Sequence, residues 1–358
     1  MNKIIIILFL FPLLGKSQAF FAPAFPGAVG SHGFYRTITV NHVQVPNTDQ
    51  TNFPFLVNGN ADLATVANGG LVQNANGYDI YFASDVNGVS RLKFDRQRWN
   101  ATTGAAEFWV KISNISHVTD SVIYEFYGNP SITTDQSNRT AVWDANFSGV
   151  YHFGDTLTAP SQTVLDATSN AANMTSNGTW VSTQQIAGQI GGALQLINGS
   201  GDYLNFTAPT LTGPWTIEGW VNISATGSNS IYFGRVSGGN EDMNWFGGNL
   251  IMYNGATNDI VSVATIGANV WHHYAITRSG TSQIMYIDGV QNATSTNGSN
   301  FRIFTAIGKQ GAGTITNNLQ IDETRISVSV RSADWIKTEY NTSTSSTFYS
   351  LGSRNNAP

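Results

Sequence analysis

The segment that most constrains the fold is residues 271–288, WHHYAITRSGTSQIMYID. Its two runs are rich in Tyr, Ile, Trp and Thr, which favour a half-buried pleated surface. The connection between them, Ser279 to Ser282, contains a glycine, and loops of this kind are common in β-hairpins. Asp288 and Gly289 follow, and both tolerate the positive φ angles of a second tight turn. The chain is therefore expected to build antiparallel β-structure around a central hairpin.

Both halves of the chain carry similar β-rich segments, separated by turns rich in Gly and Asn. No stretch between residues 34 and 130 has a helical period, and a chain of 358 residues suits two domains. The expected fold class is all-β, with an N-terminal β-sandwich-like domain followed by a second β-sandwich. The predicted strands are 34–45, 53–58, 78–83, 107–112 and 121–128 in the first half, and 216–221, 231–236, 250–253 and 319–326 in the second.

Composition excludes several classes of function. Charged residues make up 11% of the chain, the net charge is −5, and the 17 Lys and Arg residues are scattered. A nucleic-acid-binding face needs clustered basic residues, so no nucleic-acid partner is expected. Cysteine is absent, which excludes disulfide bonds, thiolate chemistry and Cys-based zinc sites.

Residues 1–19 have the pattern of a signal peptide. A basic residue precedes an apolar run at 4–14, and Ser17 and Ala19 supply the small residues that cleavage requires. The run is too short to cross a hydrocarbon layer of about 30 Å, so we expect cleavage, with an uncleaved anchor as the alternative. Residues 20–33 are then a linker or N-terminal arm. The mature protein is expected to be secreted or exposed at the cell surface, with no transmembrane span after cleavage.

Five motifs in the first half carry a family resemblance. In chain order they are YRTITV, YDIYFASDVNGVSRLKFD, GAAEFWVKIS, VIYEFYGNPS and AVWD. Through them residues 34–146 resemble the β-rich domain of unknown function 2341. The biochemical role of that family is not settled. The resemblance implies a fold neighbourhood and a position just before a LamG-like domain in surface or secreted proteins.

The second half contains a longer ordered set of motifs. These include GVYHF, VLDATSN, GQIGGALQL, GSGDYLNF, TIEGWV, NVWHHYAITRSG, QIMYIDGVQ, FTAIGKQG, LQIDETRIS and RSADWIKTEY. Their order and spacing make residues 147–352 resemble a concanavalin A-like, LamG-type jelly roll, with residues 353–358 as a tail. Ser332 can cap a short helix with Asp334 in its first turn, and we expect this helix to close one end of the sandwich.

The residues argue against catalysis by this sandwich. A retaining glycosidase needs two carboxylates about 5 to 5.5 Å apart, on one strand face. Asp322 and Glu323 are adjacent, so on a regular strand they face apart, and Glu218 stands alone beside Trp220. His272 and His273 likewise face apart, with no third ligand at suitable spacing, so packing and hydrogen bonding are favoured over a metal site. We therefore expect no enzyme activity.

A ligand-binding site is predicted instead in the segment 239–248, GGNEDMNWFG. Sugars stack on aromatic faces and bond to short polar side chains, and both kinds of residue occur here. The candidate ligand-binding residues are Trp245, Glu241, Asp242 and Asn244. In the alternative interpretation this is a polar surface loop with one aromatic residue tucked beneath it.

The LamG resemblance also implies a structural Ca²⁺, because such sandwiches often hold one through carboxylate and backbone oxygens. By that resemblance Asp166, in VLDATSN, and Asp322, in LQIDETRIS, are the candidate metal ligands. The alternative is that Asp166 caps a turn and that Asp322 faces solvent or an arginine.

Two classes of function remain open from the sequence. The first is a secreted or surface-exposed, non-catalytic carbohydrate-binding or adhesion protein, whose partner is a glycan or glycoconjugate. The alternative is a structural or assembly protein of a cell envelope, filament or virion that self-associates, which the apolar arm at residues 20–33 slightly favours. A glycan-active enzyme ranks third.

Overall fold

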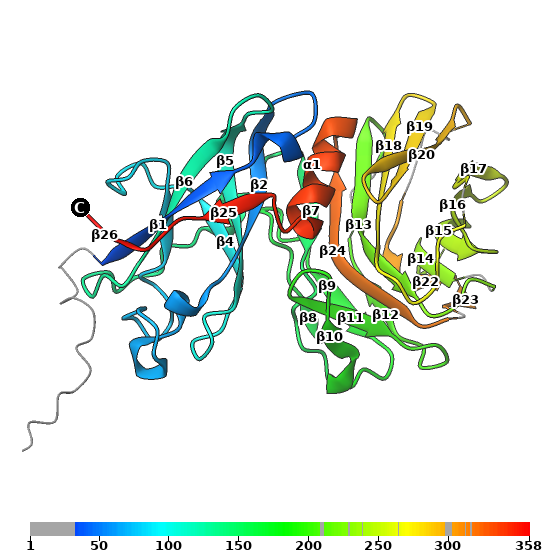
Figure 1. Ribbon diagram of the computed structural model, residues 1–358. Helices are drawn as coiled ribbons and strands as arrows, with labels where there is room; N and C mark the ends of the chain where they lie inside the picture. The colour runs from blue at the N-terminus through cyan, green and yellow to red at the C-terminus, as the bar shows by residue number, and fades with distance from the viewer. Residues whose placement is uncertain are drawn as a thin grey trace, which may run out of the picture.

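The computed structural model shows two β-sandwiches lying side by side, with helix α1 (Ala333–Thr344) between them (Figure 1). The predicted signal peptide and nearly all of the predicted arm lie outside the described residues. Within the part of the chain that is described, no helix is both long and apolar enough to span a membrane. The described residues are 33–207, 211–227, 230–237, 239–263, 265–297, 303–311, 313–315 and 317–358.

The first sandwich consists of two antiparallel sheets. One has the strand order β25-β1-β6-β3, with β26 also paired to β1, and the other has the order β2-β5-β4. Short 3₁₀ turns lie in the connections at residues 42–44, 61–63, 66–68 and 139–141. The strands are β1 (Phe34–Val40), β2 (Gln50–Asn58), β3 (Tyr81–Ala83), β4 (Phe94–Trp99), β5 (Ala106–Ile115), β6 (Ser121–Tyr127), β25 (Tyr349–Leu351) and β26 (Asn355–Asn356).

In the second sandwich, the sheet nearer the first domain has the order β10-β11-β24-β13-β18-β19-β20, with β7 paired to β24. We call it the junction sheet. Its strands are β7 (Phe147–Tyr151), β10 (Gln185–Ala187), β11 (Gly192–Leu196), β13 (Trp215–Ile223), β18 (His272–Ser279), β19 (Ser282–Ile287), β20 (Val290–Ser295) and β24 (Leu319–Ser327).

The opposite sheet of the second sandwich, the far sheet, has the order β17-β16-β15-β14-β21-β12-β9-β8. A short β22–β23 ribbon and a 3₁₀ turn at residues 182–184 complete the domain. The strands are β8 (Thr163–Val164), β9 (Met174–Asn177), β12 (Tyr203–Asn205), β14 (Ser230–Gly234), β15 (Glu241–Phe246), β16 (Asn249–Asn254), β17 (Asn258–Val261), β21 (Ala306–Ile307), β22 (Lys309–Gln310) and β23 (Gly313–Thr314).

The predicted central hairpin is confirmed. Strands β18 and β19 pair from Tyr274 opposite Ile287 to Ser279 opposite Ser282. Asp288 and Gly289, with φ angles of 53° and 70°, then turn the chain into β20. This second turn has positive φ at both central residues, as the sequence predicts, because a mirror-image turn matches the twist of the flanking strands.

The C-terminal part of the chain departs from the expected organisation. Ser332 caps α1 through a bond from the Trp335 N–H, as predicted, but α1 lies between the sandwiches instead of closing an end (Figure 1). Strands β25 and β26 then pair with β1, so the end of the expected second domain and the expected tail complete the first sandwich. The two domains are therefore linked covalently at both ends of the second sandwich.

Both faces of the junction sheet are buried. On β13, Ile217 and Val221 pack into the core between the two sheets of the second sandwich. Trp220, on the same strand, joins a second core that also contains Phe53 of the first sandwich and Trp335 of α1. The Phe53 and Trp335 rings lie 4.8 Å apart. The two sandwiches and α1 are therefore held together by a shared apolar core.

Candidate functional site

The structure corrects the predicted role of Trp245. The segment 239–248 is not an irregular loop, because residues 241–246 form strand β15 between β14 and β16. Alternation along that strand turns Met243 and Trp245 into the core, where Trp245 is only 1% exposed. A ring at this position cannot stack on a sugar, so the aromatic residue is tucked beneath the surface, as the alternative interpretation has it.

The three polar candidates lie away from Trp245. Asp242 and Asn244 are side-chain neighbours on the opposite face of β15 and are joined by a hydrogen bond from the Asn244 amide to the Asp242 carboxylate. Glu241 pairs with Arg235 at 3.1 Å. The structure therefore does not bring the four predicted residues together around one surface.

Asp166 is a turn residue whose carboxylate is fully used by the protein. Its Oδ1 accepts hydrogen bonds from the backbone N–H groups of Val150 and Thr168, at 3.0 and 2.9 Å. Its Oδ2 accepts from the Thr168 hydroxyl and the Ala172 N–H, at 2.7 and 2.9 Å. Four donors around one carboxylate leave no oxygen directed at a cation, so Asp166 does not fit the expected Ca²⁺ site.

Asp322 does not fit that site either. It is completely buried on β24, and its Oδ2 accepts the Ile190 N–H at 2.8 Å. Burial and the nearby negative charge of Glu323 raise the pKa of Asp322 well above its usual range. Asp166 and Asp322 also do not share any set of three potential ligands among the described residues.

A β-bulge on β24 overturns the expectation that Asp322 and Glu323 face apart. Trp220 pairs with Asp322 and Glu218 pairs with Arg325, so β24 has two residues where β13 has one. Glu323, one of those two residues, takes a left-handed φ of 48°. Asp322 and Glu323 consequently both contact the junction between the domains. Both are buried, at 0% and 2% exposure, so this pair of carboxylates is not accessible to a glycan.

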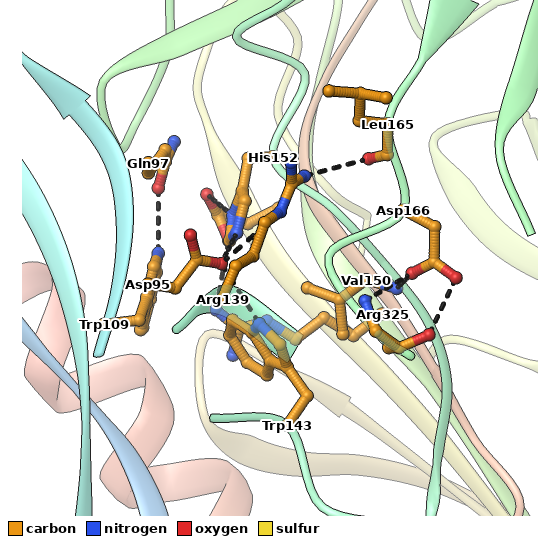
Figure 2. A network of polar contacts seen from close by, with 12 residues as sticks. Asp95, Gln97, Trp109, Arg139, Trp143, Val150, His152, Leu165, Asp166 and Arg325 are labelled. Carbon is orange, nitrogen blue, oxygen red and sulfur yellow. Dashed lines mark hydrogen bonds and ion pairs between the residues drawn. The ribbon is translucent and has the colours of Figure 1, made fainter. Parts of the chain in front are cut away.

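The junction contains a buried polar network centred on His152, which follows β7 (Figure 2). Its Nδ1 lies 2.8 Å from Glu323 of the second sandwich, and its Nε2 lies 3.0 Å from Asp95 of the first. The Trp143 indole N–H donates to the same Asp95 oxygen at 3.2 Å. Each ring nitrogen of His152 therefore contacts one carboxylate, and the two carboxylates belong to different domains.

Aromatic rings enclose this network. Trp109 on β5 stacks on His152 with ring centres 6.1 Å apart, and its indole N–H donates to Gln97 at 2.8 Å (Figure 2). The Arg325 guanidinium lies 4.4 Å from the Trp109 ring and 3.1 Å from a Glu323 oxygen. Cation–π contact and ion pairing thus place the Arg325 charge beside the first domain.

His152 is protonated at the contact between the two domains. Burial by itself lowers the pKa of His152, but attraction to Glu323 and the hydrogen bonds to Asp95 and Glu323 outweigh burial and raise that pKa to about 9. The imidazole is therefore protonated near neutral pH, with both N–H groups donating to carboxylates. In this state it has no free nitrogen with which to act as a base.

No sequence motif predicts this network as a whole. Asp95, His152 and Glu323 lie on β4, after β7 and on β24, and only the packing of two domains brings them together. One local pattern is informative. EFWVKI places Glu107 and Trp109 on one face of a predicted strand, and a carboxylate and an indole buried there would need hydrogen-bond partners.

An accessible hollow opens beside the junction on the first domain. It has a volume of about 400 Å³ and includes two aromatic side chains, Tyr78 and Trp99, both partly exposed. Arg96 lines it and is paired with Asp135 at 2.8 Å and bonded to the Asn76 carbonyl at 2.8 Å. We call it the Tyr78 hollow. Its lining residues are Ala75, Asn76, Tyr78, Arg96, Gln97, Arg98, Trp99 and Asp135.

A second hollow of about 330 Å³ adjoins the first, because Gln97 and Arg98 line both. Its other walls come from the second sandwich and include Gln185, Gly191 and Gly192. Gly191 has a φ of 64°, and a Cβ there would lie only 3.1 Å from the Glu107 carboxylate, so glycine permits the close approach of the two domains. Because they share Gln97 and Arg98, the two hollows together form a groove lined by residues of both domains.

Two known families match the chain. Residues 76–181 match a domain of unknown function, DUF2341. Residues 198–337 match the concanavalin A-like lectin/glucanases superfamily. The first match runs beyond the expected boundary at residue 146, into the first strands of the second sandwich. No curated protein matches the chain in sequence.

Solved structures also resemble part of the chain. Domain 4 of AbnA, a GH43 extracellular arabinanase from Geobacillus stearothermophilus, in complex with arabinotriose, is 20% identical with a TM-score of 0.42, over 55% of this chain and 99% of that one. The binding domain of Paraclostridial Mosquitocidal Protein 1 is 15% identical with a TM-score of 0.44, over 55% and 52%. The binding domain of Botulinum Neurotoxin DC in complex with SialylT is 14% identical with a TM-score of 0.43, over 56% and 52%.

The chain spans about half the length of the toxin binding domains that it resembles. The protein is all-β, and it carries a DUF2341 region followed by a concanavalin A-like lectin/glucanase domain, in the order that the sequence motifs predict.

Proposed function

We propose that this protein is a secreted, non-catalytic glycan-binding protein whose binding surface is the groove at the domain junction. The observation that carries the proposal is the Tyr78 hollow, where two partly exposed rings lie beside amide, guanidinium and carboxylate groups. Its volume falls within the range of about 300–1,000 Å³ typical of ligand sites. The predicted signal peptide supports secretion.

The side chains of the hollow suit sugar hydroxyls. Tyr78 and Trp99 supply partly exposed ring surface for C–H groups, with the Arg96 guanidinium 5.7 Å from the Tyr78 ring centre. The Trp99 indole N–H is already satisfied by the Leu63 carbonyl at 2.9 Å. Asn76 and Arg98 present exposed amide and guanidinium groups that donate hydrogen bonds. Ligand contact at Trp99 would therefore be made by the ring face and would leave the existing hydrogen bond intact.

The charges of the hollow support binding without hydrolysis. Asp135 is the one carboxylate among its described lining residues, and it is paired with Arg96. Glycoside hydrolysis normally requires two carboxylates flanking the scissile bond. The neighbouring Glu107 is held by two bonds of 2.7 Å from Arg98 and is buried at 7% exposure. The described lining of the hollow therefore lacks the pair of carboxylates that hydrolysis requires.

A glycan array tests this proposal. Wild-type protein and two variants, Tyr78→Ala and Phe246→Ala, would be applied to the same array. Phe246 is the matched control, because it is an aromatic residue with 56% exposure in the far sheet. We expect wild type and Phe246→Ala to bind the same glycans and Tyr78→Ala to lose them. Equal binding by all three proteins would contradict the proposed location, and a wild-type protein that binds no glycan would contradict the function.

A further inference from the structure

A small cavity lies between the junction sheet and α1, apart from the proposed glycan groove. Its volume of about 10 Å³ is enough for one water molecule or one ion. Its polar walls are Glu218, His273, Glu323, Arg325 and Glu339, with Ser343 at one side. A buried cavity with polar walls commonly holds a water molecule or an ion that satisfies those walls.

Three of these side chains converge on one point from three separate elements. Glu218 comes from β13, His273 from β18 and Glu339 from α1. Each offers one potential ligand atom, and these atoms lie within 4.8 Å of one another. All three residues are buried, with exposures of 1%, 2% and 5%. Burial of two carboxylates and an imidazole together is costly unless something neutral or positive binds between them.

Two of these three side chains, Glu218 and His273, carry buried polar atoms without a hydrogen-bond partner in the protein. Among the described residues, neither carboxylate oxygen of Glu218 has a hydrogen-bond partner, and neither has Nδ1 of His273. Buried unpartnered oxygen and nitrogen atoms are rare, and an unseen water or ion is a standard reason for them. Glu218 and His273 line the same cavity, which makes an occupant of that cavity the simplest explanation.

The charge around the cavity favours a cation over an anion. Three carboxylates and one guanidinium line it, and the protonated His152 pairs with Glu323 at 2.8 Å, which leaves one excess negative charge when all are ionised. Arg325 opposes a cation, but it contacts Glu339 and pairs with Glu323 at 3.1 Å, so its charge is shared with those groups. His273 adds an imidazole whose Nδ1 has no hydrogen-bond partner among the described residues, and imidazole nitrogen is a common metal ligand.

We propose that Glu218, His273 and Glu339 form a structural site for a divalent cation of the zinc class, which fastens α1 to the junction sheet. One imidazole and two carboxylates are ligands that Zn²⁺ accepts. Tetrahedral zinc with bonds of about 2.1 Å holds its ligand atoms about 3.4 Å apart, so small side-chain rotations would close the set. Because the three residues are buried, the ion would stabilise the arrangement of the domains and would not face a substrate.

Metal content and thermal unfolding test the proposal. Full-length, tag-free protein would be treated with a chelator, equilibrated with ZnCl₂, passed over a desalting column and measured by mass spectrometry of metals. His273→Gln and Glu218→Gln remove one ligand each. His272→Gln is the matched control, since His272 is the preceding residue but pairs with Asp288 at 2.8 Å.

We expect about one zinc ion per chain in wild type and in His272→Gln, and at least a tenfold lower content in the two ligand variants. The midpoint of thermal unfolding should rise with zinc concentration in the first two proteins and stay constant in the others. If His273→Gln fails to fold, the nearly isosteric Glu218→Gln gives the same comparison. A wild-type protein that retains no zinc, or ligand variants that retain as much as wild type, would overturn the proposal.

Discussion

Raising the pH from about 6 to about 10 is expected to destabilise the protein by removing the proton from His152. The imidazolium is held between Asp95 and Glu323, and the raised pKa of about 9 exceeds its ordinary value of 6.5. Below pH 6.5 both folded and unfolded chains carry the proton, so the stabilisation is complete. Between pH 6.5 and 9 only the folded chain keeps the proton, so stability falls as the pH rises, and above 9 the contribution is lost.

The size of the effect follows from the shift. A difference of about 2.5 pKa units corresponds to about 3 kcal/mol of unfolding free energy, at about 1.4 kcal/mol per unit. Three other charged groups lie around His152. Arg139 is near Asp95, Arg325 pairs with Glu323, and Asp155 interacts electrostatically with His152 itself. His152→Gln fills a similar volume without titrating, so its stability should lack this slope.

Urea unfolding of wild type and His152→Gln at several pH values measures the difference directly. The two free energies should converge by about 3 kcal/mol between pH 6.5 and pH 9 or above. Titrating groups that do not interact with His152 contribute equally to both proteins and cancel in this comparison. Parallel curves for the two proteins across that range would refute the assignment of a protonated His152 at the junction.

Three further predictions concern stability. Trp245→Ala should lower the free energy of unfolding in urea by about 3–5 kcal/mol, because the ring is buried. Phe246→Ala should change it by less than about 0.5 kcal/mol, and similar losses for both variants would contradict the packing. Burial raises the pKa of Glu125 to about 7, so between pH 4.5 and 7 only the folded chain keeps this proton and wild type should lose stability as the pH rises. Glu125→Gln should remove that loss, and an unchanged dependence of stability on pH in the variant would contradict the prediction. Ending the chain after Phe348 removes β25 and β26, so limited proteolysis should open the first sandwich first, and an unchanged digest would refute their role in that sheet.

Local patterns allowed much of the fold to be predicted. The β18–β19 hairpin, the Asp288–Gly289 turn and the Ser332 cap each depend on residues within a few positions of one another. The edge strand β25 could not be predicted in the same way. It has only three residues, and its partner β1 lies more than 300 positions earlier in the chain, so no local pattern marks the pairing.

The candidate sites were harder to predict than the strands. Alternation in EDMNWF shows that Trp245 and Asp242 face apart, but the core face can be chosen only when the neighbouring strands are known. The bulge at Glu323 reverses the orientation that regular alternation implies. Glu218 and His273 were considered separately because sequence spacing cannot show that α1 brings Glu339 to them.

The central claim is that glycan binding occurs at the Tyr78 hollow and not on the far sheet. The most direct test is a calorimetric titration of the strongest array glycan into wild type, Tyr78→Ala and Phe246→Ala. A stacking residue at the centre of a site contributes about 2 kcal/mol or more, so Tyr78→Ala should raise Kd at least about thirty-fold while its unfolding midpoint stays close to wild type. Phe246→Ala should leave Kd unchanged. A Kd that Phe246→Ala raises and Tyr78→Ala does not would contradict the account.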